Sequence, residues 1–231
     1  MLSLTEKFVK EIERRILTGQ WPIGMRLPSS RELAEEFMVS RSVINAGIAE
    51  LCKDGYLTTV PRKYICVSNW RETGSFALLR SLMENGLCDV QFFDDIFESR
   101  MNTGKATAIK AAAARTEEDL ARLRNAIDRE KQCRTAEQRA QADREFHCAI
   151  AAASHNIIYM VMHNNFSSMA ELLSREFYEK LTDVSFILQQ HERIYEAIRN
   201  RDPAEAERNV EILLTHGEME LRKWREVSRS V

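Results

Sequence analysis

The sequence predicts a mainly α-helical protein of two domains, a small one that ends in a β-hairpin and a larger all-helical one. Three of its four prolines, Pro22, Pro28 and Pro61, fall in the first 61 residues. No glycine occurs between Gly104 and Gly217. A long segment without glycine, rich in Ala, Glu, Leu and Arg, is typical of packed helices joined by short turns.

Composition and charge exclude some classes of protein. The chain has 231 residues, 44% of them hydrophobic and 29% charged, as in ordinary globular proteins. No apolar run approaches the roughly 18–20 residues of a membrane-spanning helix, and the start lacks the features of a signal peptide. The 5 cysteines form no C-x-x-C pair, which favours reduced thiols over disulfides or zinc ligands. We therefore expect a cytoplasmic protein with no membrane partner.

The first domain is predicted to span residues 1–67. Phe8, Ile12 and Ile16 recur at intervals of four residues and form one face of a first helix that stops near Gly19. This spacing predicts an amphipathic helix packed against the rest of the domain.

Two further helices and a hairpin follow in this domain. Ser29 and Glu32 fit a capping box that opens a short second helix, and Ser40 is the expected N-cap of the third. Two strand-like runs, 56–60 and 64–67, come next and are joined by a short turn. Three helices followed by a β-hairpin are the winged helix-turn-helix arrangement.

The N-terminus of the third predicted helix carries groups suited to DNA. Its free backbone N–H groups and positive dipole end favour phosphate. Arg41 can bind phosphate or a guanine edge, and Ser40 and Ser42 can donate hydroxyl groups. Arg31 is placed to contact the flanking DNA backbone. The alternative is a capped surface helix with ordinary solvated charges, since the net charge of −2 does not itself indicate nucleic acid.

Residues 19–44 carry the pattern G-x-W-P-x-G-x-x-LPSSRELAEEF-x-VSRS-x-I, which closely resembles the GntR family of bacterial transcription regulators. The resemblance implies a homodimeric winged-helix protein that binds a double-stranded DNA operator. It matches Arg31, Ser40, Arg41 and Ser42 to the family's DNA-contacting positions.

The chain departs from that family pattern in two places. Asn45 stands where the family usually has a base-contacting arginine, and asparagine pairs naturally with adenine rather than guanine. Pro61, Arg62 and Lys63 occupy the wing tip, where the family usually has glycines. Arg62 and Lys63 would still give the wing a favourable positive charge.

After a predicted linker at residues 68–75, residues 76–231 resemble the FCD-like effector domain of the FadR-type subgroup. The resemblance rests on ARTEEDLARL, ADREFHCAIAAASHN and HERIYEAIRNRDPAEA. It implies an antiparallel helical bundle that in many members holds a divalent metal beside a small carboxylate effector. Carried over by position, the ligands are Asp143, His147 and His191.

The spacing of these residues is consistent with a metal site. Asp143 and His147 are four residues apart, which places an oxygen and a nitrogen ligand on the same side of one helix. His191 shares a helical face with Ile187 and Ile194 and is expected to point inward. The alternatives are a surface ion pair for the first two residues and a core histidine for the third.

The fourth ligand and the effector contact are less regular. The family's last histidine falls at Leu213, and His216 follows three residues later, so His216 is the candidate fourth ligand. Arg100 matches an arginine that the subgroup often turns into the effector cavity, where it can pair with a carboxylate. We interpret His155 and His163 as structural or surface residues. Zinc, nickel and manganese all suit the mixed oxygen and nitrogen set.

The sequence thus predicts a ligand-responsive, DNA-binding transcription regulator, a repressor released by a small carboxylate metabolite. One alternative is a metal-free regulator that binds an acyl-CoA, as some members of the subgroup do. Another is a DNA-binding dimer whose second domain serves assembly alone. A metal-dependent enzyme is a further alternative, but the sequence has no H-E-x-x-H, no phosphate-binding glycine loop and no nucleophile motif. We therefore expect no enzymatic activity.

Overall fold

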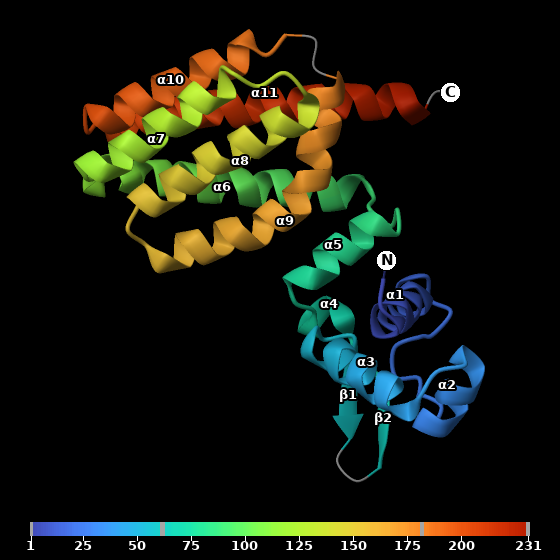
Figure 1. Ribbon diagram of the computed structural model, residues 1–231. Coiled ribbons are helices and arrows are strands. Elements are labelled where there is room, and N and C mark those ends of the chain that lie inside the picture. The colour runs from blue at the N-terminus through green and yellow to red at the C-terminus, as the bar shows by residue number, and fades with distance from the viewer. Residues whose placement is uncertain (1, 61–62, 181–182, 230–231) are drawn as a thin grey trace. The chain divides into compact units, whose positions relative to one another are not determined.

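The computed structural model describes residues 2–60, 63–180 and 183–229, with side chains outside 167–172 and 224–229. It divides into two compact units, Met1–Asp89 and Val90–Val231 (Figure 1). None of the helices in the described ranges is long and apolar enough to cross a lipid bilayer.

The first unit begins with the predicted winged helix-turn-helix, which the structure confirms (Figure 1). Its elements are α1 (Leu4–Leu17), α2 (Ser30–Phe37), α3 (Arg41–Lys53), β1 (Leu57–Val60) and β2 (Tyr64–Val67). The two strands are antiparallel, with Leu57 opposite Val67. Both predicted helix starts are confirmed, because Ser29 forms a capping box with Glu32 and the Ser40 side chain accepts from the backbone of Val43.

Close packing of α1 on α3 fixes the position of the third helix. Phe8, Ile12 and Ile44 are almost completely buried in this contact. A Cβ at Gly47 of α3 would lie 2.4 Å from the Phe8 ring, so a side chain at this position would force the helices apart. The apolar faces that were predicted from spacing therefore hold the N-terminus of α3 in place.

Residues 68–89 also pack with the first unit, although the sequence assigns 68–75 to a linker and 76 onward to the second domain. They form α4 (Trp70–Thr73) and α5 (Phe76–Glu84). Trp70 and Leu78 join the core of the first unit. The Ser81 hydroxyl donates to a Glu13 carboxylate oxygen at 2.7 Å, which ties α5 to α1.

The second unit is the expected bundle of helices (Figure 1). Its elements are α6 (Val90–Ala114), α7 (Glu117–Glu130), α8 (Ala136–Ala153), α9 (Ile157–Lys180), α10 (Ser185–Arg199) and α11 (Pro203–Arg229). Helix α6 packs along α11, and α8 lies between α7 and α9. Phe146 and Ile194 are among its fully buried side chains. The mainly α fold class predicted from the sequence is confirmed.

Candidate functional site

The start of α3 presents hydrogen-bonding and charged groups to solvent. The hydroxyls of Ser40 and Ser42 lie 2.7 Å apart and share a hydrogen bond, while Arg41 between them is exposed. Because Ser40 also caps the helix, its position is fixed by the backbone of α3. This arrangement leaves the Arg41 guanidinium and the first backbone N–H groups open to an anion.

The other predicted DNA contacts belong to α2, to α3 itself and to the wing. Arg31 on α2 is 69% exposed and forms an ion pair with Glu35 at 3.5 Å. Asn45 on α3 is exposed, and Lys63, the residue before the wing's second strand, is exposed as well. Arg62 lies outside the described residues. An exposed pair such as Arg31–Glu35 is weak, so phosphate can replace the carboxylate.

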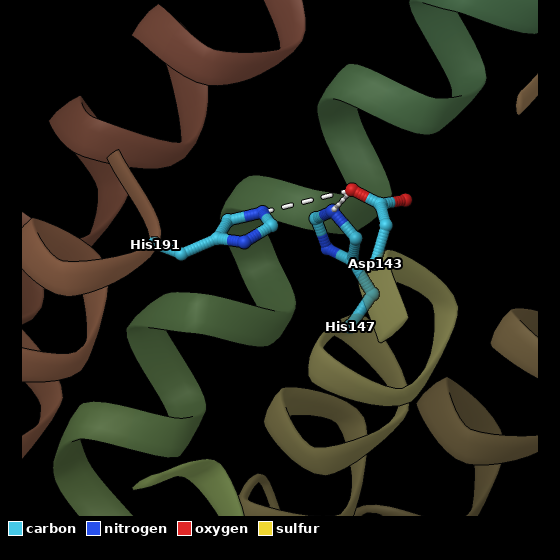
Figure 2. A group of neighbouring side chains, drawn as sticks. All are labelled: Asp143, His147 and His191. Carbon is cyan, nitrogen blue, oxygen red and sulfur yellow. Dashed lines mark ion pairs between the residues drawn. The ribbon is translucent and has the colours of Figure 1, made fainter. Parts of the chain in front are cut away.

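Asp143, His147 and His191 converge inside the second unit, as Figure 2 shows. One ligand atom from each lies within 4.8 Å of the others. The Asp143 Oδ1 atom is 3.8 Å from His147 Nε2 and 3.6 Å from His191 Nε2. Helix α8 supplies the first two residues at the predicted i,i+4 spacing, and α10 supplies the third.

Two residues that the sequence analysis missed hold this group in place. Glu130, buried at the end of α7, lies with its Oε2 atom 2.6 Å from His191 Nδ1. The Tyr178 hydroxyl of α9 donates to Asp143 Oδ1 at 3.1 Å. Glu130 continues the apolar spacing of Leu123 and Ile127, and an acidic residue on a buried stripe at a helix C-terminus is unusual. This pattern in the sequence could have identified Glu130 as the partner of a buried polar group.

Burial and charge set the protonation states in this group. Burial lowers the pKa of His147 to about 3, and the neighbouring Arg100 acts in the same direction. Burial opposes ionisation of Asp143, but the positive charge of Arg100 and the hydrogen bond from the Tyr178 hydroxyl favour the carboxylate, and the pKa of this carboxyl lies below its usual value. A neutral imidazole beside a carboxylate is the combination that divalent metals require of their ligands.

A cavity of about 230 Å³ opens beside these side chains. Arg100 of α6 lines it together with Asp143 and His147, and a smaller cavity of about 60 Å³ shares the same three residues. His163 of α9, which we expected to be a structural or surface residue, also lines the larger cavity. The remaining walls include the apolar side chains Ile96, Phe97, Ile150, Phe166, Leu173, Val210, Leu214 and Leu221.

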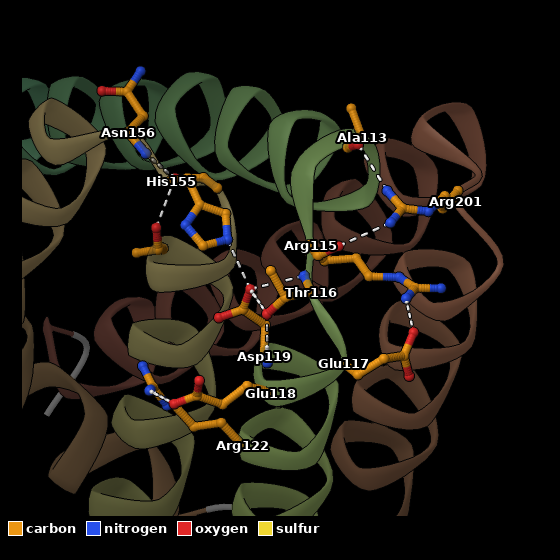
Figure 3. A network of polar contacts seen from close by, with 12 residues as sticks. Ala113, Arg115, Thr116, Glu117, Glu118, Asp119, Arg122, His155, Asn156 and Arg201 are labelled. Atoms are coloured by element: carbon orange, nitrogen blue, oxygen red, sulfur yellow. Dashed lines mark hydrogen bonds and ion pairs between the residues drawn. The ribbon is translucent and has the colours of Figure 1, made fainter.

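The structure does not bring His216 into the group of ligand atoms found among the described residues. Its ring packs at a tilt against that of Phe186, with 4.3 Å between ring centroids. Leu213 lines the smaller cavity in its place, beside Asp143 and His147. His155 lies elsewhere, with its Nε2 atom 2.8 Å from the Asp119 carboxylate (Figure 3).

Family models match both units of the chain. Residues 95–216 match the FCD domain, and residues 4–67 match the bacterial regulatory proteins of the gntR family. The chain belongs to the GntR family and carries an FCD domain. This GntR protein is therefore a transcription regulator that combines a helix-turn-helix DNA-binding domain with an FCD effector domain.

Curated relatives match both domains of this regulator and cover 76–92% of its length. LutR of Bacillus subtilis, an HTH-type transcriptional regulator, is 30% identical, and the match covers 88% of this chain and 94% of LutR. Mce2R of Mycobacterium tuberculosis is 29% identical over 92% of this chain and 89% of its own length. A fatty acid metabolism regulator protein of Shewanella amazonensis is 27% identical over 76% of this chain and 71% of its own.

Solved structures share the fold. The structure of Lar, which controls the expression of the Listeria monocytogenes agr system, superposes with a TM-score of 0.65 and covers 96% of this chain and 98% of Lar, at 15% identity. The E. coli McbR/YncC structure gives a TM-score of 0.55 at 17% identity, covering 97% of this chain and 100% of its own. At such low identity these matches concern the fold alone.

Proposed function

We propose that this GntR regulator is a homodimeric repressor whose FCD domain holds one divalent metal and a carboxylate effector. Asp143, His147 and His191 would hold the metal, and Arg100 would pair with the effector. A divalent metal at this position would supply positive charge and open coordination positions for a carboxylate oxygen. The effector would release the DNA-binding domain from its operator.

The observation that carries the proposal is the state of the His191 ring. This side chain is fully buried, and its Nδ1 atom is occupied by Glu130. Its Nε2 atom is buried and has no hydrogen-bond partner. A carboxylate that accepts the Nδ1 proton leaves the Nε2 lone pair facing Asp143, where a cation would satisfy both groups. An unsatisfied buried nitrogen otherwise costs about 1–3 kcal/mol.

The cavity supports an anionic effector with an apolar body. Arg100 is a cation in its lining, and the walls described above are mostly apolar. Relatives of this chain include proteins named as regulators of fatty acid metabolism and of an L-lactate dehydrogenase operon. Both names refer to carboxylates, one with a long apolar chain, and membership of the FadR-type subgroup is part of the same proposal.

On the DNA side, we assign operator contacts to groups at the start of α3, on α2 and at the tip of the wing. The set comprises Arg31, Ser40, Arg41, Ser42, Asn45, Arg62 and Lys63. The FCD domain serves binding and regulation rather than catalysis in this proposal, because a catalytic metal needs a positioned general base and a reaction partner.

Metal analysis of protein purified without chelator tests the proposal. The unsubstituted protein should carry about one divalent metal per chain, and H147A should carry much less because it removes one of three ligands. H155N is the matched control, since it changes a histidine outside the group at a positive φ of 49 degrees that asparagine tolerates. His216→Ala should also keep the metal if water or effector completes the shell.

Thermal melting and effector binding separate the two effector classes. Metal bound to the folded state alone should raise the melting temperature, and chelation should lower it. L-lactate and a medium-chain fatty acid serve as probes, with an acyl-CoA as the third. If metal-free protein binds a probe and melts at the same temperature as metal-loaded protein, the metal-free acyl-type alternative replaces this proposal.

A further inference from the structure

The wing, which is the hairpin of β1 and β2, is widened by a third extended segment around Arg26. Arg26 forms an isolated antiparallel bridge with Cys66 of β2. The backbone N–H of Leu27 donates to the Ile65 carbonyl at 2.9 Å, which keeps the segment in register. Opposite residues of an antiparallel pair present their side chains to the same face, and every second residue of a strand shares that face. Arg26 therefore lies on the same face as Cys66 and Tyr64.

This face of the wing is turned to solvent. Leu27 and Val67 point to the opposite face and are buried in the core of the first unit. Arg26 is exposed, and Tyr64 is 39% exposed. The guanidinium carbon of Arg26 lies 5.3 Å from the centroid of the Tyr64 ring, within the range of a cation–π contact. Because Arg26 stands opposite Cys66 and reaches Tyr64, its side chain extends along the sheet toward the wing tip.

The segments that form this sheet carry basic residues and no acidic ones. Residues 18–31 and 55–71 contain no Asp or Glu, although the whole chain has 35. Lys63 at the wing tip is exposed, like Arg26. Among the described residues, no carboxylate forms an ion pair with Arg26. A cation that is held in place without a counterion from the protein is suited to an anion from outside.

We propose that Arg26 is a further operator-contacting residue, which binds a phosphate of the DNA backbone beside the wing. Tyr64 is the positioning residue that holds the Arg26 guanidinium toward the wing tip. A row of unpaired cations suits the regularly spaced phosphates of DNA, which the helix-turn-helix domain of this family binds. The proposal rests on the placement of α3 and the wing at the operator, and it extends that placement to the third segment of the wing.

Operator binding at several salt concentrations tests the contact at Arg26, with an operator selected from genomic fragments. Arg26→Ala should weaken affinity about 5-fold per bound protomer at about 0.15 M salt, because one phosphate contact releases about 0.9 counterion. The slope of log affinity against log salt should fall by about 1 per protomer. Arg26→Lys keeps the charge and should keep the slope.

Arg71→Ala is the matched control for Arg26→Ala. The Arg71 guanidinium also lies over an aromatic ring, 4.1 Å from the centroid of Trp70, but on α4, which follows the end of β2 away from the wing tip. This substitution should change neither the affinity nor the salt slope. Fluorescence anisotropy measures both quantities for both variants.

Tyr64 substitutions measure the positioning role. Tyr64→Phe keeps the ring and should bind like the unsubstituted protein. Tyr64→Ala should weaken affinity about 2- to 5-fold, the size of an exposed cation–π contact. It should cause no further loss in a chain that already carries Arg26→Ala, because the guanidinium that the ring positions is then absent.

Three results would overturn the proposal. Arg26→Ala could bind like Arg71→Ala, it could lose affinity with an unchanged salt slope, or Tyr64→Ala could weaken binding equally with and without Arg26→Ala. Arg41→Ala tests the placement of α3 separately. A loss of affinity in Arg41→Ala alone refutes only the contact at Arg26, whereas unchanged affinity in both variants also refutes the placement of α3 at the operator.

Discussion

The two candidate sites of this regulator differ in how their polar groups are held. Around α3, Arg41 and Asn45 are exposed, and the Arg31 side chain is 69% exposed. In the FCD domain, by contrast, the side chains of His191 and Asp143 are 0% and 13% exposed. The first site faces water, and the second lies inside the helical bundle.

This difference has a physical consequence for mutations. An exposed cation is solvated whether or not a phosphate is bound, so its removal changes binding and leaves stability nearly unchanged. A buried polar group must be satisfied within the protein, so its removal changes stability and ligand binding together. DNA binding and effector binding should therefore respond differently to substitution.

The largest effect is expected for Phe146→Ala in the FCD domain. Phe146 is fully buried, and its ring centroid lies 4.1 Å from that of His191. Loss of the ring should lower the free energy of unfolding of this domain by about 3–5 kcal/mol and weaken metal binding as well. Urea unfolding and metal titration measure both. Ile157→Ala, at a side chain 71% exposed, is the control and should stay within about 0.5 kcal/mol.

If the free energy of unfolding of Phe146→Ala is as little changed as that of Ile157→Ala, the position of His191 does not depend on the core of the bundle. The comparison between the exposed and the buried site would then be contradicted for the buried site.

An intermediate effect is expected for Arg41→Ala. It should weaken specific operator binding by about 1–3 kcal/mol and leave the melting temperature unchanged, because the side chain is exposed. Binding should also depend less steeply on salt, since one phosphate or base contact is lost. Fluorescence anisotropy at several salt concentrations measures both quantities. Arg122→Ala, which removes another exposed arginine in the FCD domain, should leave operator affinity unchanged.

A melting temperature that falls in Arg41→Ala as much as operator affinity does would contradict the comparison, because it would mean that the exposed site also supports the fold.

The smallest effect concerns an ion-pair network between α7 and α10, which lies between the two extremes of exposure. Glu192 lies 3.0 Å from Arg124 and 2.7 Å from Lys131. The hydrogen bond from Arg124, reinforced by Lys131, lowers the pKa of Glu192 from 4.5 to about 2. A lowered pKa means that the ionised form is favoured in the folded state. Its stabilisation is therefore present above pH 4.5 and is lost as the pH falls to about 2.

Glu192→Gln should accordingly lower the free energy of unfolding by about 1 kcal/mol or less at neutral pH. The difference in free energy of unfolding between Glu192→Gln and the unsubstituted protein should shrink as the pH falls from 4.5 to about 2. Urea unfolding at a series of pH values measures this difference. A difference that stays constant down to the lowest pH would assign the effect to packing. Glu118→Gln, at a side chain 85% exposed, is the matched control with little expected change.

Local sequence signals predicted the helix starts and the first half of the candidate metal site. The capping box at Ser29 and the N-cap at Ser40 involve residues within one helical turn, so the sequence contains all the partners. The same reasoning holds for Asp143 and His147, whose spacing places them together on any helix.

Contacts between distant segments could not be predicted in this way. The partner of His191 is Glu130, 61 residues earlier, and the partner of Asn45 is Ser30 on another helix. His216 shows the limit of periodicity, because a small shift along α11 decides which side chain reaches the cavity, and the structure places Leu213 there.

The sequence by itself determined the family, the two kinds of domain and the exposed groups at the start of α3, since these depend on short-range spacing. The family resemblance also named Asp143, His147 and His191 as one group, whereas the tertiary structure alone decided that Glu130 fixes the His191 ring and that His163 lines the cavity. The physical reason is that burial and hydrogen-bond pairing depend on how helices pack, and one helix cannot specify the side chains that its neighbour presents to it.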